Sequence, residues 1–185
     1  PSSVTESMMS AFEAGVSTIN AFARIAGAEV TAVDVGIGRP TADIRLEPAM
    51  SEQRFFEALE SGRQAVKEMD IDLILLGEMG ICNNTSSAAI SCALLGGDTS
   101  DWVGRGTGID DDGLHRKREA VQHAVKRVAG ASPQEILREL GGAEIVAISG
   151  AIIEARRRKI AVVLDGFVVA AGAAPLHACD PLALE

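Results

Sequence analysis

The 185-residue sequence has few aromatic residues: Phe, Trp and Tyr together make up 3% of it, and Tyr is absent. A core must therefore consist mainly of Ala, Val, Ile and Leu side chains. A surplus of positive charge is also lacking, because 17 basic residues stand against 26 acidic ones, for a net charge of −9. Duplex nucleic-acid binders normally carry a basic surplus, so no nucleic-acid partner is expected. Local groups must hold any anionic ligand, since the overall field repels it.

Only three cysteines are present, and Cys82, Cys92 and Cys179 share no C-x-x-C spacing. A scattered set of odd number indicates reduced thiols in a cytoplasmic protein, not a disulfide framework. No apolar run reaches the roughly 18 residues that span a bilayer, so we expect no membrane span and see no secretory leader.

Apolar residues from Met8 to Ala26 recur at three- and four-residue steps, which predicts one helix with a single buried stripe. A capping box at Ser3 would begin this helix and Gly27 would end it. Residues 144–157 mix helix and strand signals, and we interpret them as a short strand or turn that leads into a helix.

Apolar and partly β-branched segments predict strands at residues 28–35, 71–76 and 160–164. The segment 71–76 is almost wholly apolar, which is typical of a parallel strand covered on both faces. Between the strands, helical patterns occupy residues 86–95 and 114–128, and two further helices are expected after caps at Ser51 and Ser132, the latter ending at Gly141.

This alternation predicts an α/β fold with a mainly parallel sheet and helices on both faces, a Rossmann-like three-layer arrangement without the dinucleotide fingerprint. We expect residues 1–185 to form a single domain. Both ends resemble cuts in a longer protein, although an ordinary processed start at Pro1 is the alternative. Ligands of such folds bind at the carboxyl ends of strands, so a site is expected in the loops after residues 76 and 164.

The segment Leu76-Gly-Glu-Met-Gly80 runs from a buried strand through a glycine loop into a helix. Free backbone N–H groups and the helix dipole make such a bend an anion site, suited to phosphate. The sequence matches neither a Walker A loop nor Gly-x-Gly-x-x-Gly. Glu78 is costly beside a phosphate, which suggests a role towards a sugar or a proton. A capped helix with a solvated Glu78 remains an equal alternative. Additional donors are expected from Asn83, Asn84 and Thr85.

A second glycine-rich loop, Val103 to Gly113, precedes a helix in which Lys117 lies one turn from the start. Such a lysine reaches a phosphate as a point charge. A calcium loop would need Gly108 as its first ligand, which excludes calcium, and we interpret the aspartates after it as helix-start residues. His115 and His123 lie about 12 Å apart along a helix and form no chelating pair, so no metal site is expected.

Together these motifs resemble the nicotinate-nucleotide:dimethylbenzimidazole phosphoribosyltransferase family of cobalamin biosynthesis. The resemblance runs in order along the whole chain, and its motifs are Gly77-Glu-Met-Gly-Ile81, Asn83, Val103-Gly-Arg-Gly-Thr-Gly108, Lys117, Gly141-Gly142, Ser149-Gly150 and Val163-Leu-Asp-Gly-Phe167. It implies a pentosyltransferase that moves phosphoribosyl from nicotinate mononucleotide to 5,6-dimethylbenzimidazole, giving α-ribazole 5′-phosphate and nicotinate. It also implies that no cofactor is needed and that the protein is a homodimer.

The resemblance further implies residue roles. Glu78 would lie near the ribose and the reacting centre, and Ile81 would touch the base. The 5′-phosphate would be held by a set of loop and helix residues, namely Gly80, Cys82, Asn83, Asn84, Thr85, Gly106 and Lys117.

Two parts of the family pattern have no counterpart in this sequence. The family's general-base glutamate lies in an Arg-Leu-Gly-Glu-Gly stretch that is absent, and the segment that walls the benzimidazole pocket is missing. We therefore interpret the chain as the central, phosphate-binding part of such an enzyme, truncated at both ends relative to the family. A non-catalytic nucleotide-binding module and a subunit that needs a partner to supply the base remain alternatives.

Overall fold

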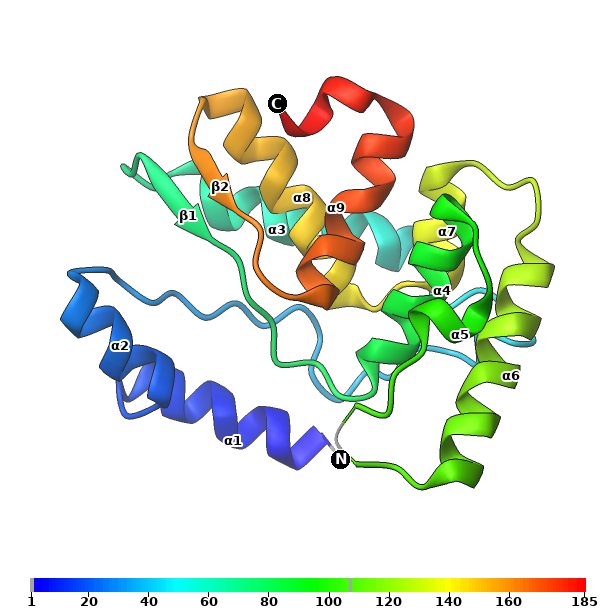
Figure 1. Cartoon of the computed structure of the whole chain (residues 1–185). Coiled ribbons are helices and arrows are strands. Elements are labelled where there is room, and N and C mark those ends of the chain that lie inside the picture. The colour runs from blue at the N-terminus through cyan, green and yellow to red at the C-terminus, as the bar shows by residue number, and fades with distance from the viewer. Residues whose placement is uncertain (1, 107) are drawn as a thin grey trace.

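Figure 1 shows the computed structural model of the chain, which describes residues 2–106 and 108–185. Pro1 and Thr107, which the sequence interpretation included, lie outside the described residues. The elements in chain order are α1 (Ser2–Glu13), α2 (Thr18–Ala26), α3 (Glu52–Lys67), β1 (Leu73–Leu75), α4 (Asn83–Leu95), α5 (Thr99–Trp102), α6 (Asp111–Arg127), α7 (Pro133–Leu140), α8 (Ala143–Arg158), β2 (Ala161–Val163), α9 (Phe167–Cys179) and the 3₁₀ helix η1 (Pro181–Leu184).

The N-terminal segment forms two helices, so the prediction of one continuous helix is wrong. Gly15 adopts φ +69° between α1 and α2, a left-handed conformation that ends α1. Ser17 then caps α2 in a reciprocal pair with Asn20. The predicted cap, Ser3, lies inside α1. Gly27 ends α2 in the left-handed conformation, as predicted.

Residues 28–35 form no strand, contrary to prediction. A strand needs a neighbour to satisfy its backbone groups, and the structure pairs β1 with β2 alone among the described residues. Asp34 instead closes a turn by accepting hydrogen bonds from the N–H groups of Gly36 and Ile37.

Residues 144–157 lie within one continuous helix, α8, so the predicted short strand or turn is wrong. Its β-branched side chains, such as Ile145 and Val146, are fully buried against neighbouring helices. Burial of this kind outweighs the small helix penalty of β-branched residues.

The α/β class and the parallel sheet are confirmed. Strands β1 and β2 pair in parallel with Leu73, Ile74 and Leu75 opposite Ala161, Val162 and Val163. The sheet has two strands over the described residues, and its coverage is one-sided. Ile74 and Val162 pack on α3 and α8, whereas Leu73 and Leu75 on the other face are 52% and 66% exposed. Helices on both faces are therefore not found in this part of the chain.

Helices α3 and α8 pack against each other through glycines. A Cβ at Gly62 would overlap the carbonyl oxygen of Ala147, and one at Gly150 would overlap that of Leu59. The main hydrophobic core lies beside this pair and joins α3, α4, α6, α7 and α8. This packing fixes α4 and α8, whose N-terminal ends build the candidate site.

The loops at the carboxyl ends of the strands lead into α4 and α9, which pack on each other. Figure 1 shows the chain leaving β1 and β2 on the same side and entering these two helices. The two loops in which the sequence predicts a site therefore lead into neighbouring helices. Helices α4 and α6 begin three residues earlier than predicted, and the short α5 immediately precedes the second glycine-rich loop.

Candidate functional site

The loop after β1 turns sharply at Cys82, the residue before α4. Cys82 adopts φ +67°, the left-handed region that residues other than glycine rarely occupy. Its side chain makes no capping hydrogen bond to the helix. Such a conformation costs about 1–3 kcal/mol, which is typical of backbone held in place for a functional reason.

The bend leaves backbone donors free. Thr85 N–H donates to Cys82 O over 3.2 Å, but the N–H groups of Ile81, Cys82, Asn83 and Asn84 find no acceptor among the described residues. Unpaired N–H groups at a helix start, together with the positive end of the helix dipole, form an anion site. The first turn of α4 therefore fits a phosphate.

Glu78 points into this loop and is not solvated as the alternative interpretation had it. Its Oε2 accepts a hydrogen bond from Gly80 N–H over 2.6 Å and another from the Asn83 side-chain amide. Two donors assigned to a phosphate are thus directed at a carboxylate in this structure. A phosphate bound here uses the remaining amides, with Glu78 on the rim at the side of Gly80.

The second glycine loop reaches the first. Gly106 adopts φ +61°, and a Cβ built there would lie 3.8 Å from Asn84 Nδ2 and 3.9 Å from Lys117 Nζ. Lys117 Nζ donates to Gly104 O over 3.0 Å. Burial lowers the pKa of Lys117, and the nearby Cys82 partly opposes this. The structure therefore brings Lys117, Gly106 and the start of α4 together, although their ligand stays a prediction.

Ile81 and Thr85 lie at the edge of the same site. Ile81 is exposed on the loop, and Thr85 is half-buried in the first turn of α4. The exposed Ile81 side chain is free to meet a ligand's apolar part, which agrees with the role expected for it.

The sequence interpretation missed Glu144, in the first turn of α8. A Cβ at Gly80 would lie 2.6 Å from Glu144 Oε1, so this carboxylate directly covers the phosphate loop. Burial raises the pKa of Glu144, and Glu78 raises it further, while its own backbone N–H, Asn83 and Arg54 act in the opposite direction. The sequence pattern that could have indicated Glu144 is the pair Gly141-Gly142 just before α8, with an acidic residue in the first turn.

No group of three or more His, Cys, Asp or Glu side chains within residues 2–106 and 108–185 gathers closely enough to hold a metal ion. Asp110 caps α6 by accepting from Gly113 N–H over 2.7 Å, which confirms its interpretation as a helix-start residue. All three cysteines are free. Among the described helices, none combines the length and apolar character needed to cross a membrane.

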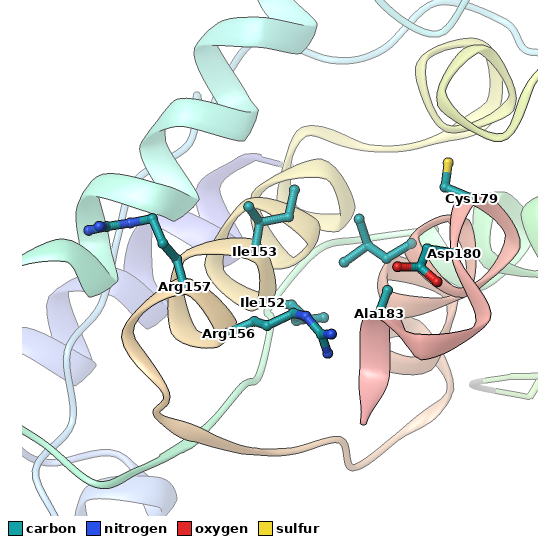
Figure 2. Close-up of a pocket in the computed structure, with 8 residues that line it drawn as sticks. Ile152, Ile153, Arg156, Arg157, Cys179, Asp180 and Ala183 are labelled. Atoms are coloured by element: carbon teal, nitrogen blue, oxygen red, sulfur yellow. The ribbon is translucent and has the colours of Figure 1, made fainter.

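A cavity of about 450 Å³ lies elsewhere, between α8 and the C-terminal end of the chain (Figure 2). Figure 2 shows Ile152 and Ile153 on the α8 side and Asp180 and Ala183 on the other. The lining is mainly apolar, and the cavity holds none of the residues expected to bind substrate. It is separate from the candidate site.

The family model described as Phosphoribosyltransferase matches residues 1–185. The chain belongs to this phosphoribosyltransferase family. It is 48% identical to the nicotinate-nucleotide--dimethylbenzimidazole phosphoribosyltransferase of Methylorubrum extorquens, and 47% identical to that of Mesorhizobium japonicum. Both alignments cover 100% of this chain and 55% of the relative.

Among solved structures, CobT from Thermus thermophilus superposes with a TM-score of 0.92 at 38% identity, over 99% of this chain and 61% of that one. This phosphoribosyltransferase chain thus spans about half the length of the curated relatives it matches. The resemblance identified from the motifs is confirmed, and it covers part of the length of these relatives.

Proposed function

We propose that the protein is a nicotinate-nucleotide:dimethylbenzimidazole phosphoribosyltransferase, and that this chain supplies its nucleotide-binding part. Its substrates are nicotinate mononucleotide and 5,6-dimethylbenzimidazole, and its products are α-ribazole 5′-phosphate and nicotinate. Family membership and the names of the relatives support this proposal. A homodimer and a cytoplasmic location belong to the same proposal.

One structural observation carries the proposal: the start of α4 has free backbone amides, and the Lys117 ammonium group lies with the Asn84 side chain beside Gly106. Four unpaired N–H groups and one cation suit the doubly charged 5′-phosphate of a mononucleotide. The binding is local, because the chain as a whole carries a net charge of −9.

The reaction forms a bond from a benzimidazole nitrogen to C1′ of the ribose and breaks the bond from C1′ to the nicotinate nitrogen. The departing nitrogen is cationic in the mononucleotide, so it leaves with the bonding pair and needs little acid assistance. Positioning is then the main requirement of the site. Holding the phosphate at α4 places the ribose beside Glu78, whose carboxylate stabilises positive charge that develops at C1′.

The acceptor loses a ring proton, which requires a general base. Glu78 is committed to Gly80 and Asn83 in this structure, which suits an electrostatic role better than proton removal. Turnover therefore requires a base from elsewhere in the protein, and mononucleotide binding is the function that this chain performs by itself.

The proposal is tested by mixing the protein with nicotinate mononucleotide and dimethylbenzimidazole and following α-ribazole 5′-phosphate by mass spectrometry. Calorimetry with the mononucleotide alone runs in parallel. We expect saturable mononucleotide binding, with product formed once the segments common to the relatives are present. Binding without product even then would favour the non-catalytic module. Absence of binding would reject the nucleotide site itself.

A further inference from the structure

The carboxylates of Glu78 and Glu144 converge on Gly80 from two different elements. Glu78 belongs to the loop after β1, and its Oε2 accepts from Gly80 N–H over 2.6 Å. Glu144 comes from the first turn of α8, and its Oε1 lies 2.6 Å from where a Cβ on Gly80 would be. The absence of a side chain at Gly80 is what lets the Glu144 carboxylate and the Asn83 amide approach it.

One amide group lies between the two carboxylates. Asn83 Nδ2 donates to Glu78 Oε2 and lies 2.5 Å from the same Cβ position on Gly80. Asn83 also interacts with the Glu144 carboxylate, which favours the ionised form of Glu144. Asn83 is buried, and both glutamates are partly buried.

The surrounding groups do not balance two negative charges. Arg54 on α3 is the cation that faces Glu144, but its guanidinium donates to the carbonyl oxygens of Arg39 and Pro40. Burial and then the neighbouring Glu78 raise the pKa of Glu144. A phosphate arriving at α4 adds more negative charge and acts in the same direction.

A purely structural role for Glu144 is the competing explanation. Gly142 offers no side chain to cap α8, and the helix dipole stabilises an ionised carboxylate in the first turn. The backbone N–H of Glu144 contributes to that stabilisation and lowers the pKa of the Glu144 carboxyl. The net shift of this pKa is nevertheless upward. Burial and the second carboxylate therefore outweigh the helix contribution.

We propose that Glu144 takes up a proton when a nucleotide phosphate enters the loop, which removes one negative charge from beside Gly80. Glu144 is a positioning residue, because it acts through Asn83 and Gly80. This inference rests on the proposed function, since the phosphate is that of nicotinate mononucleotide. The consequence is that nucleotide binding consumes a proton at pH values above the 4.5 of an ordinary glutamate.

The first measurement needs no variant. Calorimetry of nicotinate mononucleotide binding in two buffers of different ionisation enthalpy gives the number of protons taken up by the whole chain. A second series compares affinities of the unaltered protein, Glu144→Gln and a control, Glu154→Gln, from about pH 5 to pH 8. Glu154 is a buried carboxylate on the same helix that pairs with Arg63 and Arg157, away from the site.

A glutamine mimics the protonated carboxylate, so the affinities of Glu144→Gln and the unaltered protein should converge as the pH falls towards the acid end of the range. Near pH 8 the variant should bind about tenfold more tightly, which corresponds to one pKa unit of coupling. The ratio of the two affinities cancels the ionisation of the ligand's own phosphate near pH 6. The number of protons taken up on binding should fall for Glu144→Gln and stay unchanged for Glu154→Gln.

An affinity ratio that stays constant across the pH range would overturn the inference and leave the nucleotide site standing. Equal proton uptake by the unaltered protein and Glu144→Gln would do the same. Weaker binding by Glu144→Gln at every pH would show that Glu144 is a structural contact. If no form binds the mononucleotide at any pH, the proposed function fails and this inference fails with it.

Discussion

Lys117 is the cation that the structure brings to the start of α4, and its contribution is directly measurable. Lys117→Ala should weaken nicotinate mononucleotide binding by roughly 1.5–3 kcal/mol, the scale of a hydrogen bond to a charged group. Lys126→Ala, nine residues further along α6, should leave the affinity unchanged. Isothermal titration calorimetry measures both, and equal affinities for the Lys117 variant and the parent would remove Lys117 from the site.

A substitution at Glu78 distinguishes a role in substrate binding from a role in the chemical step. Glu78→Gln keeps the shape of the side chain but removes the negative charge beside the ribose. We expect little change in mononucleotide affinity and a loss of roughly 100-fold or more in kcat in a form that turns over, as for other catalytic electrostatic groups. Steady-state kinetics with matched binding measurements test this. Parallel losses in affinity and kcat would show that Glu78 serves the structure of the loop.

At the residue scale, sequence patterns predicted the bend between β1 and α4 but not the second carboxylate beside it. The loop was predictable because an apolar strand, a Gly-x-x-Gly bend and a polar helix start are contiguous from residue 76 to residue 89. Glu144 lies far along the chain, and only the packing of α8 brings it to Gly80. No pattern of neighbouring residues in the sequence predicts such a contact between distant parts of the chain.

At the scale of elements, the close contact between α3 and α8 holds the α8 N-terminus in place. Gly150→Ala forces a methyl group against the Leu59 carbonyl, so the helices must separate. Overpacking of this kind costs about 1–3 kcal/mol, and Glu144 should move away from Gly80 with the helix. Thermal unfolding should show a lower Tm for the variant.

The matched control for this prediction is Ser61→Ala, a half-buried position on α3 next to Gly62 whose hydroxyl bonds only within its own helix. It should change the free energy of unfolding by less than about 0.5 kcal/mol. A Gly150→Ala variant as stable as this control would mean that α3 and α8 are not as tightly packed as the structure shows.

The elements that sequence patterns predicted well are those with explicit end signals. Ser51 and Ser132 cap α3 and α7 as expected, and each accepts a hydrogen bond from the third residue of its helix. Errors came where tertiary context decides. Gly15 divided an apolar pattern that continued on both sides, and α8 carries β-branched residues whose burial favours a helix.

At the scale of the whole molecule, the net charge opposes the local groups that would bind a phosphate. A chain of net charge −9 repels an anionic ligand at long range, although Lys117 and the α4 amides attract it at contact. Salt screens the long-range repulsion, so the association rate constant of nicotinate mononucleotide should rise with ionic strength. Stopped-flow fluorescence of the single tryptophan measures this rate.

Nicotinate riboside, which lacks the phosphate, is the matched control and should associate at a rate almost independent of salt. A rate constant for the mononucleotide that falls as salt is added would mean that a positive local field steers the ligand, contrary to this account.

The sheet also shows how far the surroundings of a strand can be predicted from its sequence. The apolar run 71–76 predicted a strand covered on both faces, but Leu73 and Leu75 are exposed on one face of β1. An apolar pattern shows that the side chains of a strand favour burial, but it does not show which element buries them. This chain spans about half the length of its curated relatives.

The central claim is that the bend after β1 and the first turn of α4 bind the nucleotide's phosphate. Amide ¹H–¹⁵N spectra recorded during titration with nicotinate mononucleotide test it most directly. The account predicts large, saturable shifts for the amides of Cys82, Asn83 and Asn84, with the same midpoint as calorimetry. Saturable binding that leaves these three amides unshifted, and moves amides elsewhere, would contradict it.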